Sequence, residues 1–341
     1  MDRSALGWLA RAASAALFAF GLASGVSFAD TGNDLTLPVG SAPAVRFQMR
    51  SGVLIVRTGP GSQVHVSSTQ QVTAQHFAGQ AVQSALRGGD IPIFSTSVQS
   101  PSGPITLPAE EFAVNSLGNG SHDGITILGG DSNATVTLTV PSDTGLLWAN
   151  VGRGRIEMQD YHTGSFVARV HNGSIQAQNV GGEGFLEVAR GPITVSNSSF
   201  DRLRARTAAG NISFEHCYAR QIEVSSVTGN VLYDDGSFAP GLARFESQQG
   251  NVGIGVSGGG VQIGAHSGDG QIYQSFDRPS RVQGSENDAQ ALVDGGGPVV
   301  TASSERGRVF LYNGSLKAHA DMRSRWQPVG RKRKRPPGAT F

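Results

Sequence analysis

LWANVGRGRI, residues 147–156, returns with the same pattern as FVARVHNGSI at 166–175 and as LRARTAAGNI at 203–212. Each copy has a glycine at its eighth position, and successive glycines are 19, 18, 19, 19, 21 and 20 residues apart, followed by a gap of 37. A period near 20 residues is typical of a solenoid, whose turns bury their inner faces only by stacking on one another. The repeated glycines are Gly154, Gly173, Gly191, Gly210, Gly229, Gly250, Gly270 and Gly307.

The residues around each glycine follow a second regularity. A β-branched residue stands two positions after every glycine, and the positions seven, five and three residues before it are apolar or small. Alternation with a period of two on both sides of a turn indicates two short strands per repeat, each with one buried face. The sequence therefore predicts an all-β, single-domain parallel β-solenoid (β-helix) with rungs of about 19–20 residues.

Composition and charge narrow the class of protein. The 341 residues include 47 glycines, and because these recur beside regular Ile and Val, a disordered Gly-rich chain is excluded. Residues 30–320 carry 18 basic and 24 acidic side chains, whereas residues 321–341 carry 7 and 1. Cys217 is the only cysteine, which excludes an intrachain disulfide and a thiolate metal cluster and predicts a packing residue.

The chain divides into an export signal, one domain and a tail. Residues 1–29 combine two arginines, an apolar run at 12–22 and small residues before Asp30, which predicts a secretory signal cleaved after Ala29. An uncleaved membrane anchor is the weaker alternative, because Gly and Ser interrupt the run. We expect a flexible lead-in at 30–44, the solenoid at 45–320 and a disordered basic tail at 321–341. Within the solenoid, 45–56 is a first rung, 299–311 a late rung, 69–120 an insertion with a helix at 69–87, and 275–297 a loop.

Several short motifs resemble those of a known family. VTLTVP at 136–141 leads into 146–156 with its Gly-x-Ile turn, and the turns Gly-Ser-Ile, Gly-Asn-Ile and Gly-Asn-Val follow. Together with the early rung at 45–56, these motifs resemble a family of exported bacterial proteins called putative adhesins, over about residues 45–312. The resemblance implies a single-domain parallel β-helix at the cell envelope. It brings no catalytic residues with it, and fold alone does not determine function.

Three local patterns have both a chemical and a structural interpretation. GIGVSG at 253–258 matches the Gly-x-Gly-x-x-Gly of dinucleotide sites, but it continues a strand and no helix follows. Asp269 lacks the recurring carboxylates of a calcium-binding β-roll. Asp234 and Asp235 precede a glycine as in ordinary turns, without the supporting motifs of β-helical polysaccharide hydrolases. The sequence therefore predicts no catalytic residue, no cofactor and no metal site.

Charged residues at outward positions are predicted to stabilise the register of the rungs. Neighbouring rungs stack about 4.8 Å apart, so charges of opposite sign at equivalent positions come into contact. Exposed pairs of this kind contribute about 0–1 kcal/mol each. The two predicted ladders are Arg204–Glu223–Arg244 and Arg169–Glu187–Arg206.

Two further features are candidates for interaction. An apolar stripe interrupts the polar outward face, and we favour the insertion at 69–120 as its cover over an outside partner. A basic run in the tail is either an electrostatic tether to an anionic surface or a solvated end without a role. The stripe comprises Trp148, Val167 and Phe185, and the run comprises Arg331, Lys332, Arg333, Lys334 and Arg335.

The function that these observations favour is that of a non-enzymatic, exported cell-envelope or surface β-solenoid, used for adhesion or as a scaffold. Its partner would be an envelope polymer or another protein, and no specific nucleic acid is expected. The alternative is a carbohydrate-active β-helix enzyme, a polysaccharide lyase or hydrolase. A cleft lined by two or more carboxylates together with Arg or Lys would favour the enzyme.

Overall fold

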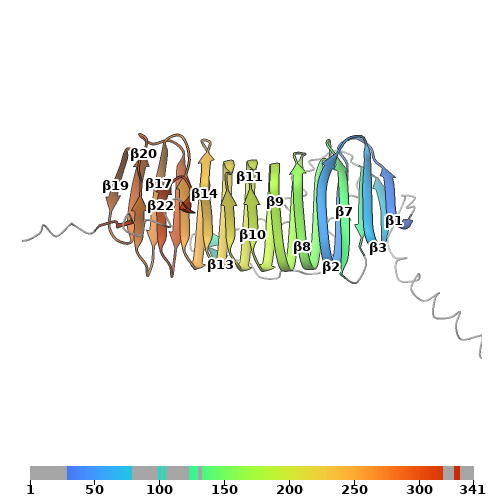
Figure 1. Cartoon of the computed structure of the whole chain (residues 1–341), viewed down its shortest axis with the longest axis horizontal. Coiled ribbons are helices and arrows are strands. Elements are labelled where there is room, and N and C mark those ends of the chain that lie inside the picture. The colour runs from blue at the N-terminus through green and yellow to red at the C-terminus, as the bar shows by residue number, and fades with distance from the viewer. Residues whose placement is uncertain are drawn as a thin grey trace, which may run out of the picture.

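The computed structural model describes residues 29–78, 99–100, 103–104, 123–129, 133–317 and 326–330. Apart from the short pair β4–β5, its strands belong to one continuous sheet that forms a single elongated stack (Figure 1). In chain order the strands are β1 (Ala29–Pro38), β2 (Ala44–Gly59), β3 (Gln63–Ala78), β4 (Gln99–Ser100), β5 (Gly103–Pro104), β6 (Asp123–Leu128), β7 (Ala134–Pro141), β8 (Leu146–Tyr161), β9 (Ser165–Arg190), β10 (Ile193–Ser196), β11 (Ser199–Ala209), β12 (Ile212–Glu215), β13 (Tyr218–Thr228), β14 (Val231–Phe238), β15 (Ala243–Gln249), β16 (Val252–Val256), β17 (Val261–Ser267), β18 (Ile272–Ser275), β19 (Ser280–Gly284), β20 (Asp288–Val293), β21 (Val299–Ser304), β22 (Val309–Asn313) and β23 (Gln327–Pro328).

The middle of the stack confirms the predicted parallel solenoid. The first half of β9 lies parallel to β8 with Gly173 opposite Gly154, and its second half lies parallel to β11. β11 pairs in turn with β13, while β10, β12 and β14 form the equivalent row after the glycine turn. Each rung therefore stacks on the rung that precedes it in the chain.

The glycine turns form a column because no larger residue fits there. A Cβ built on Gly173 would overlap the carbonyl oxygen of Gly154, and one on Gly191 would overlap that of Gly173. The backbone is also left-handed along most of the column, with φ of 144° at Gly173 and 159° at Gly210. Both constraints restrict these positions to glycine.

The positions three, five and seven residues before the glycine face the core, which confirms the predicted register. In the rung of β8 these are Val151, Ala149 and Leu147, all fully buried. Later rungs place Thr or Ser three residues before the glycine, and each hydroxyl has a partner. Ser247 Oγ, for example, donates to the Gly229 carbonyl at 2.8 Å, so a small polar residue is accommodated inside the stack.

Both ends of the stack depart from chain order. β2 lies between β7 and β8, with Gly52 opposite both Gly154 and Ala134, so the predicted first rung is confirmed but is not the outermost one. At the other end, β21 lies between β15 and β17, and β22 lies between β16 and β18. The predicted late rung therefore lies between two rungs that both precede it in the chain.

Antiparallel strands cover the two ends, in segments for which the sequence predicted other structures. β1 pairs with β3, and β3 with β6 and β7, so part of the predicted lead-in at 30–44 is an ordered strand. β3 also occupies residues 69–78, where a helix was predicted; buried Val72 and Ala74 show the period of a strand. The remainder of that helix lies outside the described residues. In place of the predicted loop at 275–297, β19 and β20 form an antiparallel pair beside β17. These strands protect the open edges of the sheet.

Part of the predicted disordered tail is ordered. Val329 is buried, and β23 pairs antiparallel with β18 at Gln274 and Tyr273. The predicted disordered tail at 321–341 therefore contains ordered residues at 326–330, because Trp326 and Val329 have apolar surfaces to pack against. Arg331–Arg335 lies outside the described residues.

A second corner, six residues after each of the first five repeated glycines, escaped the sequence analysis. Its residues are all left-handed, and short polar side chains tolerate that conformation. Within the column, Asn179 Nδ2 donates to Asp160 Oδ1 at 2.6 Å. The recurrence of Asp, Asn or His at this offset was the available signal. The residues, with φ between 50° and 54°, are Asp160, Asn179, Asn197, His216 and Asp235.

Candidate functional site

One predicted charge ladder forms, but in a buried environment. Glu187 accepts hydrogen bonds from Arg169 Nε at 2.8 Å and from Arg206 Nε at 2.6 Å. The Glu187 side chain is only 2% exposed, so the expectation of a solvent-exposed pair is wrong for this ladder. A buried carboxylate needs such partners, because an unpaired charge there would be strongly destabilising.

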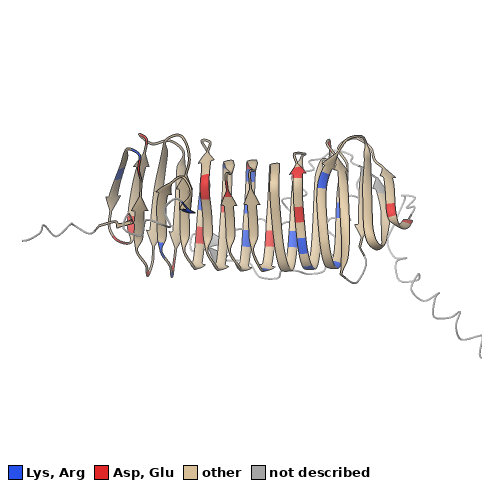
Figure 2. Ribbon diagram, viewed as in Figure 1, with Lys and Arg blue, Asp and Glu red and all other residues tan. Residues whose placement is uncertain are grey.

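The other predicted ladder forms only in part. Arg204 lies 3.1 Å from Glu223, as expected. Arg244 instead pairs with Glu246, two residues further along its own strand and on the same outward face. Charged residues of both signs are interspersed along the stack, without a large patch of one sign in the view of Figure 2.

The apolar stripe is fully buried although it lies outside the core. Trp148, Val167 and Phe185 are each 0% exposed, and none belongs to the continuous core cluster. The guanidinium of Arg46 lies 5.9 Å from the Trp148 ring, and that of Arg206 lies 5.0 Å from the Phe185 ring. Most of the predicted cover at 69–120 lies outside the described residues, so the identity of the cover and any role in interaction stay predictions.

Asp234 is a structural carboxylate. It is buried and accepts from Tyr312 Oη at 2.8 Å, Ser315 Oγ at 2.9 Å and the Leu316 amide at 2.7 Å. Burial, together with the negative charge of Asp234, raises the pKa of Tyr312, so this phenol remains a donor. Asp235 occupies the left-handed corner and faces His216 Nδ1 at 3.1 Å. Asp234 thus holds the C-terminal segment against β14, a role that the turn interpretation did not include.

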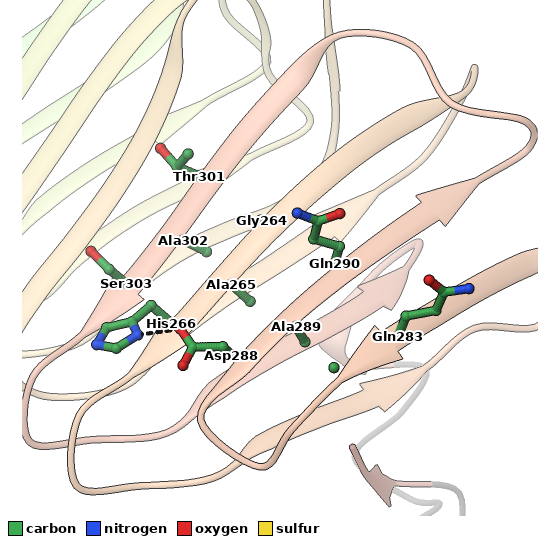
Figure 3. A pocket seen from close by; sticks show the side chains of 11 residues that line it. Gly264, Ala265, His266, Gln283, Asp288, Ala289, Gln290, Thr301, Ala302 and Ser303 are labelled. Atoms are coloured by element: carbon green, nitrogen blue, oxygen red, sulfur yellow. Dashed lines mark hydrogen bonds and ion pairs between the residues drawn. The ribbon is translucent and has the colours of Figure 1, made fainter. Parts of the chain in front are cut away.

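A first hollow of about 510 Å³ opens beside β17, β20 and β21 (Figure 3). His266 Nδ1 lies 2.7 Å from Asp288 Oδ1, and Ser303 lies opposite His266 in the strand register. Among the described residues no hydrogen bond joins Ser303 to His266, and the Asp288 side chain is 73% exposed. A serine nucleophile requires a base within hydrogen-bond reach and a held carboxylate, so this arrangement lacks the geometry of a catalytic triad. Its lining comprises Gly264, Ala265, His266, Gln283, Gly284, Asp288, Ala289, Gln290, Thr301, Ala302 and Ser303.

A second hollow of about 460 Å³ lies over β12, β14, β16 and β22, and we call it the aromatic hollow. None of its lining residues is charged. Phe310 and Tyr312 form one side, and Trp326 packs edge-on against both, at centroid distances of 5.2 and 5.8 Å. Its lining comprises Asn211, Ile212, Ser213, Asn230, Val231, Leu232, Asn251, Gly253, Phe310, Tyr312, Leu316 and Trp326.

The aromatic hollow explains the Gly-x-Gly pattern at 253–258. β16 is a strand here, as the sequence predicted, and Gly253 lies between Leu232 and Phe310 in the register of adjacent strands. Gly255 lies beneath the Tyr312 ring, which a Cβ at that position would strike. The two glycines therefore leave β16 without outward side chains. Gly253 and Gly255 lie opposite Phe310 and Tyr312 on the adjacent rung. The sequence did not reveal this pairing, because the two segments are far apart in the chain.

A third hollow and the remaining titratable groups offer no clustered chemistry. The third hollow, of about 590 Å³, has Asp277 as its one carboxylate and Arg281 as its one cation. Cys217 is buried in the core, which raises the pKa of its thiol to about 11, in agreement with a packing residue. Asp269 is exposed in a turn. Within the described ranges there is no group of three or more His, Cys, Asp or Glu residues that could hold a metal ion.

The part of the chain that the structure describes contains no helix that is both long and apolar enough to cross a bilayer.

Comparisons with known proteins place the fold in a family. The sequence model of the Toastrack DUF4097 family matches residues 105–311. No curated protein matches the chain. A crystal structure of a putative cell adhesion protein from Clostridium sporogenes is similar at 9% identity, with 84% of this chain and 100% of that chain covered and a TM-score of 0.23. Since the family match spans more than half of the sequence, this β-solenoid belongs to the Toastrack DUF4097 family, in agreement with the resemblance to putative adhesins.

Proposed function

We propose that this chain is a non-enzymatic, exported β-solenoid of the cell envelope that binds a partner along its outer surface, in adhesion or as a scaffold. The observation that carries the proposal is the use of two buried acidic side chains, Glu187 and Asp234. Glu187 is neutralised by two arginines, and Asp234 holds the C-terminal segment. Both carboxylates are engaged by several groups of the fold itself, which supports a structural role for them rather than a catalytic one.

The lining of the hollows also favours binding over catalysis. Glycoside hydrolysis uses two carboxyl groups that flank the scissile bond. The first hollow has Asp288 alone, the third has Asp277 alone, and the aromatic hollow has none. Apolar and aromatic walls with a few polar groups are typical of ligand-binding sites. This supports the binding function over the carbohydrate-active alternative.

The test uses protein comprising residues 30–341, the chain expected after signal cleavage. We expect saturable retention on isolated envelopes of the producing organism, and no release of new sugar ends from a panel of neutral and acidic polysaccharides. Release that is abolished by Asp288→Asn or Asp277→Asn would overturn the proposal in favour of the enzyme. Absence of retention on cell-wall, membrane and protein fractions alike would overturn the binding function.

Export itself has a separate test. Intact mass measurement of protein recovered outside the cytoplasm should give a chain that begins at Asp30. A membrane-bound chain that retains Met1 would support the anchor instead.

A further inference from the structure

We infer that the aromatic hollow binds a neutral carbohydrate, one or more uncharged sugar rings of a glycan chain that follows the stack. This inference rests on the proposed binding function and specifies the ligand class and the place of binding. Its volume of about 460 Å³ is within the range of about 300–1,000 Å³ usual for small-ligand sites.

The floor of the hollow is available because of Gly253. Leu232 and Phe310 occupy the positions opposite Gly253 on the two neighbouring strands, one on each side. A Cβ built on Gly253 would lie 2.9 Å from Leu232 Cδ1, the end of a flexible side chain, and its next two neighbours, at 3.8 Å, are side-chain atoms of Tyr312. The backbone therefore permits a side chain at this position, and its absence creates the space.

The walls are held in place before any ligand arrives. Phe310 stacks on Tyr273 at a centroid distance of 5.4 Å and contacts Trp326 edge-on. Asp234 fixes two further wall residues, through the hydroxyl of Tyr312 and the amide of Leu316. A site of this kind loses little conformational freedom on binding, which favours affinity.

Three asparagines provide a row of hydrogen-bond donors beside the aromatic rings. The side-chain oxygens of Asn211 and Asn230 each accept from the backbone of the next rung at 2.8 Å, and that of Asn251 accepts from the Arg308 amide at 2.9 Å. These bonds orient the three amides alike. All three residues are exposed, and no described residue accepts from their Nδ2 groups.

This combination of groups matches an uncharged sugar. The apolar C–H face of a sugar ring packs against aromatic side chains, and its hydroxyls accept from amide N–H groups. An ionic ligand would find no opposite charge in the lining, so an acidic polysaccharide or a nucleic acid would be desolvated without compensation. Because the donors repeat once per rung, a linear glycan along the stack would meet several of them.

Titration of protein 30–341 with neutral oligosaccharides tests the inference, with glucose, mannose and N-acetylglucosamine oligomers as probes. Trp148 is fully buried, so Trp326 is expected to report binding as a change in tryptophan fluorescence; calorimetry gives Kd independently. We expect at least one neutral series to bind, and polygalacturonate not to bind. Gly253→Leu and Trp326→Ala should each raise Kd by about tenfold or more.

Gly264→Leu is the matched control, because Gly264 lines the first hollow and a Cβ there would meet nothing closer than the Val300 carbonyl at 4.0 Å. It should leave Kd unchanged. Equal affinity of wild type and Gly253→Leu, with both proteins folded by thermal melting, would overturn the site. No binding of any neutral probe would overturn the ligand class, as would occupation of the hollow by residues 318–325 of the same chain. If Gly253→Leu binds envelopes as well as wild type does, this inference fails while the proposed function stands.

Discussion

The middle of the stack and its two ends are built from the same rungs but joined in different ways. From β8 to β14 each rung pairs with its neighbours in the chain, with one glycine opposite the next. At the ends, β2 and the pair β21–β22 are each inserted between two rungs that follow one another in the sequence, although the inserted strands come from elsewhere in the chain, and antiparallel strands cover the edges. Periodic sequence therefore suffices where partners are local, whereas closing a solenoid requires contacts that interrupt the repeat.

A charge in the middle of the core should have the largest effect. Ala205→Asp places a carboxylate among Leu203, Phe214 and other core residues, where it would have no partner. We expect a loss of about 4 kcal/mol or more in the free energy of unfolding, with a correspondingly lower Tm. Thermal and urea unfolding measure it.

The matched control is Arg190→Asp, at an exposed position near the end of β9. It should change stability by no more than about 0.5 kcal/mol. Arg206 is not a suitable control, because it pairs with buried Glu187. Equal melting temperatures for Ala205→Asp and Arg190→Asp would contradict the inward register.

A change at the C-terminal end should have an intermediate effect. Asp234→Ala leaves Tyr312 Oη, Ser315 Oγ and the Leu316 amide without their acceptor. We expect a loss of about 1–3 kcal/mol, confined to the end of the stack. Hydrogen exchange should show faster opening of β22, while β9 and β11 remain protected. Equally faster hydrogen exchange throughout the stack would contradict independent opening of its C-terminal end.

The ionisation and labelling of the Cys217 thiol report unfolding of the middle of the stack. Its pKa is raised by burial to about 11, above the ordinary value of about 8.5, so folding keeps it protonated. The unfolded chain loses this proton at lower pH, so stability from this group is complete below about pH 8.5 and decreases as pH rises to about 11. Cys217→Ala should flatten that decrease. Rapid thiol labelling of folded protein at pH 8 would contradict the buried position.

Removal of the basic run should have the smallest effect on the fold. A chain ending at Gly330 keeps Trp326 and β23 and loses only Arg331–Arg335 and the residues beyond. We expect an unchanged Tm but weaker binding to anionic vesicles, by about 1 kcal/mol per cation, decreasing steeply with salt. A chain ending at Arg325 is the comparison, because it also uncovers β18 and should lower Tm. Identical vesicle binding by the Gly330 chain and the full chain would leave the tail as a solvated end.

Much of the rung register was predictable from the columns around the glycines, because burial repeats with the same offsets in every rung. The aromatic hollow was not predictable. Phe310 and Gly253 belong to segments that the sequence separates by β17–β21, and only the inserted position of β22 brings them together.

The sequence by itself determined the repeat, the glycine column and the inward face, since these depend on local strand periodicity and on backbone contacts that exclude any Cβ. Only the tertiary structure decided the order of the end rungs, the burial of Glu187 and the partners of Asp234. These depend on pairings between distant segments, whose free energy is set by packing and by the need to cover the sheet edges rather than by local pattern.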